Sequence, residues 1–262
     1  LDCKARAGSG PGGRIVQKDV LAALATAGRP GGQQTVPGGR REKMSRIRAT
    51  IGARMLKSHT EIPVVTHTVK ADVTELLAVR ERINQGREAR FSVNDFILKA
   101  VAKALALHKE MLVSFDGGEI VYHDDVHIGM AVALDTGLVV PVIRHADTLG
   151  LEALAATARD LAARARAGTL GMDEYAGSTF SVSNLGMYRG ESFTPIINQP
   201  NAAILGVCEI QDELALRDGA VTVKKVMRHC LTYDHRLMDG SGAATFQASV
   251  TELLENPLRI LV

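Results

Sequence analysis

His235 lies among polar and titratable residues at the point where an apolar stretch of the sequence ends. The stretch 221–231 is predicted to be a strand, and Asp234 and Arg236 flank the histidine just beyond it. The end of a strand can project a side chain into a cleft, and an imidazole that titrates near neutral pH is suited to remove a proton from a thiol. A lone histidine is more often structural, so a structural role and a role as general base both stay open at this point.

No other group of residues has the spacing of a metal or nucleotide site. Zinc sites need several ligands at defined spacing, and the remaining histidines have no such partners, so we expect no metal. The glycine-rich stretch 8–16 neither follows a predicted strand nor leads into the Lys-Ser/Thr pair of a P-loop, so we expect no nucleotide there. The histidines set aside on this ground are His67, His108, His123, His127, His145 and His229.

The composition excludes several classes of protein. A net charge of +2 over 262 residues is too small to indicate a surface for nucleic acid or membranes. No apolar run approaches the roughly 20 residues that cross a bilayer, and the three cysteines fit neither a disulfide framework nor a metal pair. We expect a protein of a reducing compartment, the bacterial cytoplasm or the mitochondrial matrix of a eukaryote. Because Trp is absent, we expect an aliphatic interior.

The elements that must position this histidine begin with a strand and two helices. Alternating apolar residues from 65 to 73 predict a strand with one face inward. Asp72 with Glu75, and Ser92 with Asp95, are typical of helix N-termini, because an N-cap side chain and an acidic residue three places later satisfy free backbone N–H groups. Each start is followed by apolar residues at helical spacing, so two helices with buried faces are predicted.

The second half of the chain is also mixed. Turns at 116–118 and 135–137 predict two hairpins, and an Ala-, Leu- and Arg-rich stretch predicts one helix over 149–167, closed by Gly168. Further strands are predicted at 180–182, 202–208 and 221–231, and a final helix at 243–255. Helices and strands mixed in this way predict an α/β layered domain.

The chain divides into three predicted parts. Residues 1–27 end in a short helical pattern at 19–24, residues 28–39 form a Gly/Pro-rich linker, and residues 40–262 form the larger domain. The larger domain opens with a basic amphipathic helix whose apolar face carries Met44, Ile47, Ile51 and Met55. Its basic residues, Arg46, Arg48, Arg54 and Lys57, are either solvated or face a partner or an anionic ligand.

The residues around His235 resemble the signature of dihydrolipoamide acyltransferases, the acyl-transferring components of 2-oxo-acid dehydrogenase complexes. The match is His-x-x-x-Asp-Gly, with an aspartate before the histidine and an arginine after it. Stretches that resemble the family's other hallmarks are 129–133, 137–143, 179–187 and 193–200. The resemblance implies an α/β, chloramphenicol-acetyltransferase-like two-layer fold with a mixed sheet, plus a small partial helical module at the N-terminus.

The resemblance also implies an enzyme, a dihydrolipoamide S-acyltransferase that moves an acyl group, most simply acetyl, between the lipoyl dithiol and coenzyme A. His235 then corresponds to the general base, Ser183 to the donor that stabilises the oxyanion, and Asp239 to a residue that holds the catalytic loop through an ion pair. Arg144 is a candidate for a coenzyme A phosphate. The structural alternatives are a turn or capping role for Ser183 and mutual pairing of Asp239 with Arg236.

Partners follow from the same resemblance. The N-terminal residues resemble the second half of a peripheral subunit-binding domain, in which Arg14 and Lys18 are candidates to face an acidic partner. The family forms homotrimers with His235 from one chain and Ser183 from its neighbour in one channel, and the trimers build cores of 24 or 60 subunits. The implied partners are a 2-oxo-acid decarboxylase and dihydrolipoamide dehydrogenase, with the lipoyl group on a separate domain.

Other functions stay open from the sequence. A non-catalytic core scaffold has no need for His235 together with Ser183, whereas both are present. An acyltransferase for a small alcohol or amine has no use for a subunit-binding module. Branched-chain, succinyl and acetoin-complex enzymes share the catalytic motif, so the acyl group is not decided by it.

Overall fold

The computed structural model describes residues 8–21, 39–135, 137–217 and 219–261. The chain forms two compact units, Leu1–Met44 and Ser45–Val262. Most of the predicted linker, residues 28–38, lies outside the described residues. No helix within the described ranges combines the length and the apolar character that crossing a membrane requires.

The small unit is held by one aspartate. It contains the turn η2 (Pro11–Gly13) and helical residues 17–21, so the helix predicted from residue 19 starts two residues earlier, and its predicted end at 22–24 lies outside the described residues. The Asp19 carboxylate accepts hydrogen bonds from the Ser9 hydroxyl (2.6 Å), the Ser9 N–H and the Val16 N–H. These donors, the Ser9 hydroxyl first, lower the pKa of Asp19. Arg14 and Lys18 are exposed.

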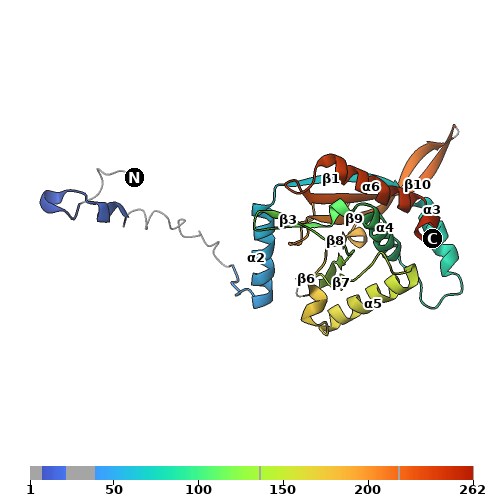
Figure 1. Cartoon of the computed structure of the whole chain (residues 1–262), viewed down its shortest axis with the longest axis horizontal. Coiled ribbons are helices and arrows are strands. Elements are labelled where there is room, and N and C mark those ends of the chain that lie inside the picture. Colours follow the sequence, from blue (N-terminus) through green and yellow to red (C-terminus); the bar gives the residue numbers. More distant parts are fainter. Residues whose placement is uncertain (1–7, 22–38, 136, 218, 262) are drawn as a thin grey trace. The chain divides into compact units, whose positions relative to one another are not determined.

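The larger unit is built on a six-stranded mixed sheet (Figure 1). Its strands are β1 (Val64–Asp72), β4 (Ile128–Met130), β7 (Val142–Ile143), β8 (Phe180–Asn184), β9 (Ala203–Arg217) and β10 (Ala220–Asp234). The order across the sheet is β1-β10-β9-β8-β4-β7, with β8 parallel to both β9 and β4 and the other pairs antiparallel. The predicted mixed sheet is confirmed.

Helices pack on the sheet and on one another. They are α2 (Arg46–Glu61), α3 (Thr74–Asn84), α4 (Val93–Leu107), α5 (Leu151–Ala167), α6 (Gly240–Glu255) and α7 (Leu258–Leu261). Helix α6 packs on β1 and β10, and α4 packs on α5, α6 and α7. The largest fully buried side chains include Phe96, Phe180 and Phe246 among many aliphatic ones, so the predicted aliphatic interior is built around a few phenylalanines.

Two predicted helix starts have different outcomes. Ser92 and Asp95 form the predicted capping box of α4, because each side chain accepts the backbone N–H of the other residue. The prediction for Asp72 is wrong by one residue, since Val73 occupies the N-cap of α3. Asp72 instead accepts hydrogen bonds from the N–H and the hydroxyl of Thr74.

The prediction of one inward face for 65–73 holds only for its second half. Ala71 and Val73 are buried, whereas Val65 and His67 are exposed. Ala71 and Val73 belong to the main hydrophobic core, whereas Val65 and His67 do not.

Opposite faces of the sheet have different chemistry. Strand residues alternate between faces, and one face contributes apolar side chains to the helix-packed core. That core includes Phe180, Val182, Leu205, Met227, Leu231 and Tyr233. The other face carries mainly small polar side chains on β8 and β10, namely Ser181, Ser183, Cys230 and Thr232.

The polar face is covered by α2 and by the segment 193–200. The Ser58 hydroxyl on α2 donates to the Ile197 carbonyl (2.7 Å), and Ile62, Ile197 and Ile204 form a small buried cluster. Residues Ile51 and Met55 of α2 are half-buried, which agrees with the predicted apolar face, but Met44 precedes the helix and is exposed.

Both predicted hairpins are present, and a third extends from the sheet. The first two are β2 (Val113–Asp116) with β3 (Glu119–Tyr122), and β5 (Val132–Leu134) with β6 (Gly137–Val139). Strands β9 and β10 continue past the sheet as a two-stranded arm, visible in Figure 1. One face of this arm carries four exposed aliphatic side chains, Leu214, Leu216, Val221 and Val223.

Candidate active site

His235 occupies a turn directly after β10. Its backbone N–H donates to the Pro63 carbonyl (3.1 Å), which ties the turn to the residue before β1. The imidazole is exposed, and its ring centre lies 5.8 Å from that of Tyr233. Within the described parts of the chain, the imidazole has no hydrogen-bond or ion-pair partner, so both ring nitrogens are available to a ligand.

The residues on either side of His235 bind each other. Asp234 is 2% exposed, and its carboxylate accepts hydrogen bonds from the Arg236 backbone N–H (3.0 Å), Nε (3.0 Å) and Nη2 (2.7 Å). The guanidinium also lies 4.4 Å from the ring centre of Phe115. Arg236 therefore pairs with Asp234, and the alternative that it pairs with Asp239 is wrong. The sequence carried no signal for Phe115.

Asp239 caps the helix that follows the turn. Its carboxylate accepts hydrogen bonds from the Gly242 N–H (2.9 Å) and the Ser241 hydroxyl (2.8 Å) at the N-terminus of α6. These two donors, the Gly242 N–H first, lower the pKa of Asp239. The contacts hold the C-terminal end of the turn that carries His235 through a helix cap, and the ion pair that the resemblance implied has no counterpart among the described residues of one chain and stays a prediction.

Ser183 lies on the polar face of β8 and is half-buried. The next residue fixes the end of the strand: the Asn184 side chain donates to Asn94 on α4 (2.9 Å) and accepts the Gly186 N–H (2.9 Å). The Ser183 hydroxyl itself has no hydrogen-bond partner among the described residues. It is therefore free to donate to a bound oxygen.

The register of the sheet separates Ser183 from His235. Ser183 is opposite Gly206, Gly206 is opposite Cys230, and His235 lies five residues beyond Cys230. At about 3.3 Å per residue and about 4.8 Å per strand, their Cα atoms are about 19 Å apart. An oxyanion donor and a general base must both lie within about 3 Å of reacting atoms. These two side chains of a single chain therefore cannot act on one reaction centre.

Arg144 is engaged by a nearby loop. One guanidinium nitrogen, Nη2, donates to the carbonyls of Asp173 (3.0 Å) and Ala176 (3.2 Å). A contact of Arg144 with a coenzyme A phosphate, through its other guanidinium N–H groups, stays a prediction.

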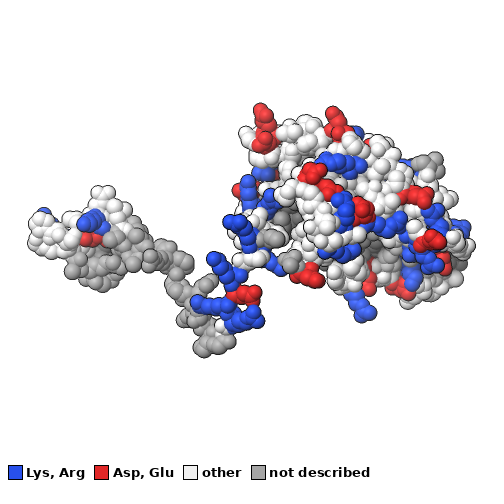
Figure 2. All heavy atoms as spheres, turned by 90° about the horizontal axis from the view of Figure 1, so that it is seen from below, with Lys and Arg blue, Asp and Glu red and all other residues white. Residues whose placement is uncertain are grey.

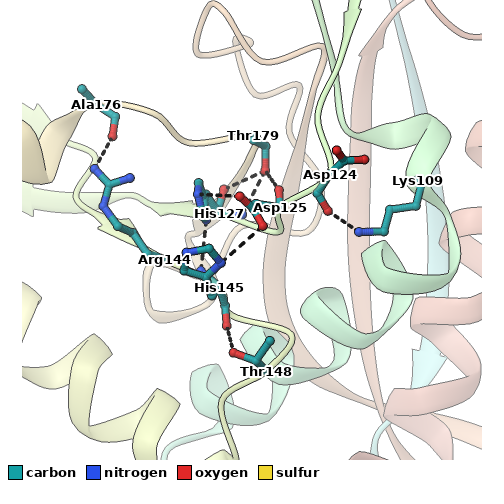
Figure 3. A network of polar contacts seen from close by, with 9 residues as sticks. All are labelled: Lys109, Asp124, Asp125, His127, Arg144, His145, Thr148, Ala176 and Thr179. Carbon is teal, nitrogen blue, oxygen red and sulfur yellow. Dashed lines mark hydrogen bonds and ion pairs between the residues drawn. The ribbon is translucent and has the colours of Figure 1, made fainter.

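One cluster not expected from the sequence brings two histidines and a carboxylate together. Figure 3 shows Asp125, His127 and His145, and one potential ligand atom from each lies within 4.8 Å of the others. The His145 and Asp125 side chains are 3.4 Å apart, and His127 Nε2 lies 3.9 Å from the same carboxylate. The prediction that His127 and His145 lack such partners is wrong.

The hydrogen bonds of this cluster do not suit a metal ion. His127 Nδ1 accepts the backbone N–H of His145 (3.0 Å), so the neutral ring carries its proton on Nε2. A histidine that binds a metal through Nε2 normally donates a hydrogen bond from Nδ1, which is the opposite arrangement. Burial, followed by the neighbouring His145, lowers the pKa of His127. The expectation of a metal-free protein stays a prediction.

The two described cysteines are free and buried. Cys208 and Cys230 lie on neighbouring strands with their sulfurs 3.9 Å apart. Burial, followed by the proximity of Cys230, raises the pKa of Cys208 to about 12, so this thiol is not a ready nucleophile.

Surface charge is mixed. Figure 2 shows basic and acidic side chains interspersed over the visible face of the larger unit. Several form exposed pairs, such as Lys225 with Asp212 and Arg82 with Glu75. This distribution agrees with the small net charge and does not mark out a large basic surface.

Residues 37–262 match the family of 2-oxoacid dehydrogenases acyltransferase (catalytic domain). The chain belongs to this family. The resemblance inferred from the residues around His235 is therefore confirmed, and the chain is an acyltransferase catalytic domain.

Similar proteins carry out related acyl transfers. The chain is 37% identical to the dihydrolipoyllysine-residue acetyltransferase component of the acetoin cleaving system of Bacillus subtilis, over 100% of this chain and 67% of the relative. It is 34% identical to the acetyltransferase component of the pyruvate dehydrogenase complex of Zymomonas mobilis, over 100% of this chain and 63% of the relative. It is 35% identical to a succinyltransferase component of the 2-oxoglutarate dehydrogenase complex of Rickettsia conorii, over 97% and 66%. The chain thus spans about two thirds of these relatives.

Solved structures support the fold. Dihydrolipoamide acetyltransferase of Azotobacter vinelandii superposes with a TM-score of 0.80 at 34% identity, over 86% of this chain and 94% of that chain. A serine, a histidine and an asparagine have been investigated for their role in the catalytic mechanism of that enzyme. The same two intervals separate Ser183, His235 and Asp239 here, with aspartate in place of the asparagine. Chloramphenicol acetyltransferase, at 15% identity and a TM-score of 0.54, over 77% of this chain and 94% of that chain, shows that the predicted fold is correct.

Proposed function

We propose that the chain transfers an acyl group between the lipoyl dithiol and coenzyme A, with His235 as general base and Ser183 as oxyanion donor. Family membership and the exposed, unpaired imidazole support this assignment. The agreement in spacing with the catalytic serine and histidine of the Azotobacter vinelandii enzyme supports the choice of residues.

The proposed reaction needs no covalent acyl-enzyme. A thiol with a pKa of about 8.5 or above is mostly protonated at neutral pH, so His235 removes its proton as the sulfur attacks the thioester carbonyl. A new carbon–sulfur bond forms, and the Ser183 hydroxyl donates to the negatively charged oxygen. When this intermediate collapses, the original carbon–sulfur bond breaks and the leaving thiolate takes the proton from the imidazolium.

The distance between Ser183 and His235 supports a site that is shared between chains. Because Ser183 and His235 of one chain are about 19 Å apart, a working site combines His235 of one copy with Ser183 of another. A homotrimer meets this requirement, since each of its three interfaces can bring the two residues together.

Mixing inactive chains tests the shared site. Ser183→Ala and His235→Gln chains are each unfolded, mixed in equal amounts and reassembled. In a randomly mixed trimer, about one quarter of the sites receive both intact residues, so the mixture recovers about a quarter of the wild-type rate.

Each variant reassembled alone is the control and stays inactive. A mixture with no more activity than its components, although it assembles into mixed particles, would rule out a site shared between chains. Full activity of His235→Gln alone would exclude His235 as the base.

Acetyl is the proposed acyl group. The relatives at 37% and 34% identity are acetyltransferases, but one at 35% is a succinyltransferase, so identity alone does not separate them. Steady-state rates with acetyl-, isobutyryl- and succinyl-coenzyme A test this choice. The highest kcat/KM with succinyl-coenzyme A would overturn it.

Assembly into a larger core is the second part of the proposal. A solved relative at 35% identity and TM-score 0.80, over 86% of this chain and 94% of that chain, is the cubic core of a pyruvate dehydrogenase multienzyme complex. By analogy, trimers of this chain build a core of 24 or 60 subunits, which binds a 2-oxo-acid decarboxylase and dihydrolipoamide dehydrogenase. The exposed Arg14 and Lys18 of the small unit are candidates for contact with an acidic partner surface.

A further inference from the structure

The turn that carries His235 is closed by its own flanking residues. The guanidinium of Arg236 binds the Asp234 carboxylate through two nitrogens, and the Arg236 backbone N–H binds the same carboxylate. A planar guanidinium that pairs with both oxygens of a carboxylate fixes direction as well as distance. The backbone immediately before His235 is thereby tied to the backbone immediately after it.

The anchor of this closed turn is buried. Asp234 is the last residue of β10, its N–H donates to the Ala202 carbonyl (2.8 Å), and its carbonyl accepts the N–H of Leu237 (3.1 Å). The Asp234 side chain therefore cannot follow a movement of the turn without leaving the sheet. The Pro63 carbonyl holds the His235 N–H from the other side.

Phe115 holds the outer side of the arginine. Its ring lies under the guanidinium at 4.4 Å, a cation–π contact. The hairpin that carries Phe115 is attached beside the anchor: Ser114 forms a bridge with Asn201, and the Ala202 N–H donates to the Val113 carbonyl. The same Ala202 binds Asp234, so the hairpin and the end of β10 share one fixed point.

We propose that Asp234, Arg236 and Phe115 are positioning residues that hold the imidazole of His235 in its catalytic place. They do so by closing the turn around it, and none of them needs to touch substrate. Two guanidinium nitrogens are bound to Asp234 and one face of the group is covered by Phe115, so these parts of Arg236 hold the turn. This inference rests on the proposed function of His235.

Conservative variants in the assembled enzyme test the inference. Arg236→Lys keeps the charge but loses the fork that binds both carboxylate oxygens. Because displacement of a catalytic group by about 1 Å can cost 100-fold in rate, we expect kcat to fall about 10- to 100-fold, while KM for each substrate changes less than about threefold. In a His235→Gln background, Arg236→Lys has no further effect, since there is no base left to position.

Arg164→Lys is the matched control. Arg164 forms a comparable forked pair with Glu174 on α5 and η4 (Met172–Tyr175), a half-buried pair that the proposed mechanism does not use. We expect its kcat to stay within about twofold of the wild-type value. An equal fall in both variants would mean that losing any such pair impairs the enzyme, which would overturn the inference.

Phe115→Leu keeps the test decisive if Arg236→Lys fails to assemble. Leucine retains an apolar contact but not the ring face, so we expect kcat to fall about two- to fivefold with KM retained. Wild-type kcat in assembled Arg236→Lys overturns the inference, as does a rise in KM alone. If Arg236→Lys does not assemble, wild-type kcat in Phe115→Leu overturns the inference. Retained activity in His235→Gln instead overturns the proposed function, so the two failures are distinguishable.

Discussion

His229 and His235 lie six residues apart along one stretch of chain, and their surroundings give them opposite chemistry. His229 is fully buried: its Nδ1 accepts a hydrogen bond from the Gln247 amide, and its Nε2 lies 3.1 Å from the Thr251 hydroxyl. His235 projects from a turn into solvent. The sequence shows two histidines near the end of the same strand, and only their packing shows which one is available for proton transfer.

The buried histidine makes stability depend on pH. Burial, followed by the neighbouring His67, lowers the pKa of His229 from 6.5 to about 4. The unfolded chain takes up this proton below pH 6.5 but the folded chain does not until about pH 4. Above pH 6.5, His229 is neutral in both states and does not lower the free energy of unfolding. As the pH drops from 6.5 towards 4, protonation of the unfolded chain lowers the free energy of unfolding by about 3 kcal/mol.

The effect is measured as the urea concentration at the midpoint of unfolding, determined at several pH values between 8 and 4. His229→Gln removes the titrating group, so its midpoint decreases less over that range than the wild-type midpoint. His59→Gln, at an exposed position on α2, is the control and keeps the wild-type dependence. An equal pH dependence in His229→Gln and wild type would exclude His229 as its source.

At the scale of elements, the helix that follows the turn of His235 depends on Asp239. Asparagine and aspartate are equivalent N-caps, whereas alanine offers no acceptor. We expect Asp239→Asn to keep the thermal unfolding midpoint and a rate within about threefold of wild type. Asp239→Ala lowers both, because the start of α6 frays and the turn that holds His235 loses its C-terminal anchor.

The α4 cap gives the control for this pair of variants. Ser92→Ala removes a comparable cap at a cost of about 1 kcal/mol but leaves the rate unchanged. If Asp239→Asn were as inactive as His235→Gln, the charge of the carboxylate would be needed in catalysis and a role limited to capping would be excluded.

Gly206 lets the covering segment approach the polar face of the sheet. Gly206 is directly opposite Ser183 in the register. A Cβ on residue 206 would lie 2.6 Å from the ring of Phe193. Gly206→Ala therefore displaces the ring, and we expect a loss of about 1–3 kcal/mol in the free energy of unfolding. Gly190→Ala, where a Cβ has no neighbour within 4 Å, is the control in the same denaturation experiment. Equal stability of the two variants would show that Phe193 moves aside without cost.

Local patterns predicted most of these elements. The capping box at Ser92, the end of α5 at Gly168 and the two glycine-containing hairpins all depend on contacts within a few residues, which composition and spacing reveal. The long-range features could not be predicted in this way. The order of the strands, the position of Phe115 beneath Arg236 and the meeting of His127 with His145 depend on pairings between distant segments.

At the scale of the whole molecule, one chain holds both proposed catalytic residues and yet cannot use them together. The motifs of the sequence predicted which residues take part, and the family resemblance implied that they come from neighbouring chains. The distance of about 19 Å between Ser183 and His235 of one chain follows from the sheet register. Activity should then require association. We expect the rate per chain to fall on dilution in step with the loss of assembled particles, measured by activity and by light scattering on the same samples. A constant rate per chain after dissociation would contradict a shared site.

The proposed division of the site between chains also affects how defects combine. A chain that carries both Ser183→Ala and His235→Gln inactivates the two active sites to which it contributes in a trimer. When half of the chains in a cell are of this kind, about three quarters of the active sites are lost. A defect in half of the chains therefore removes more than half of the activity, so the defect is partly dominant.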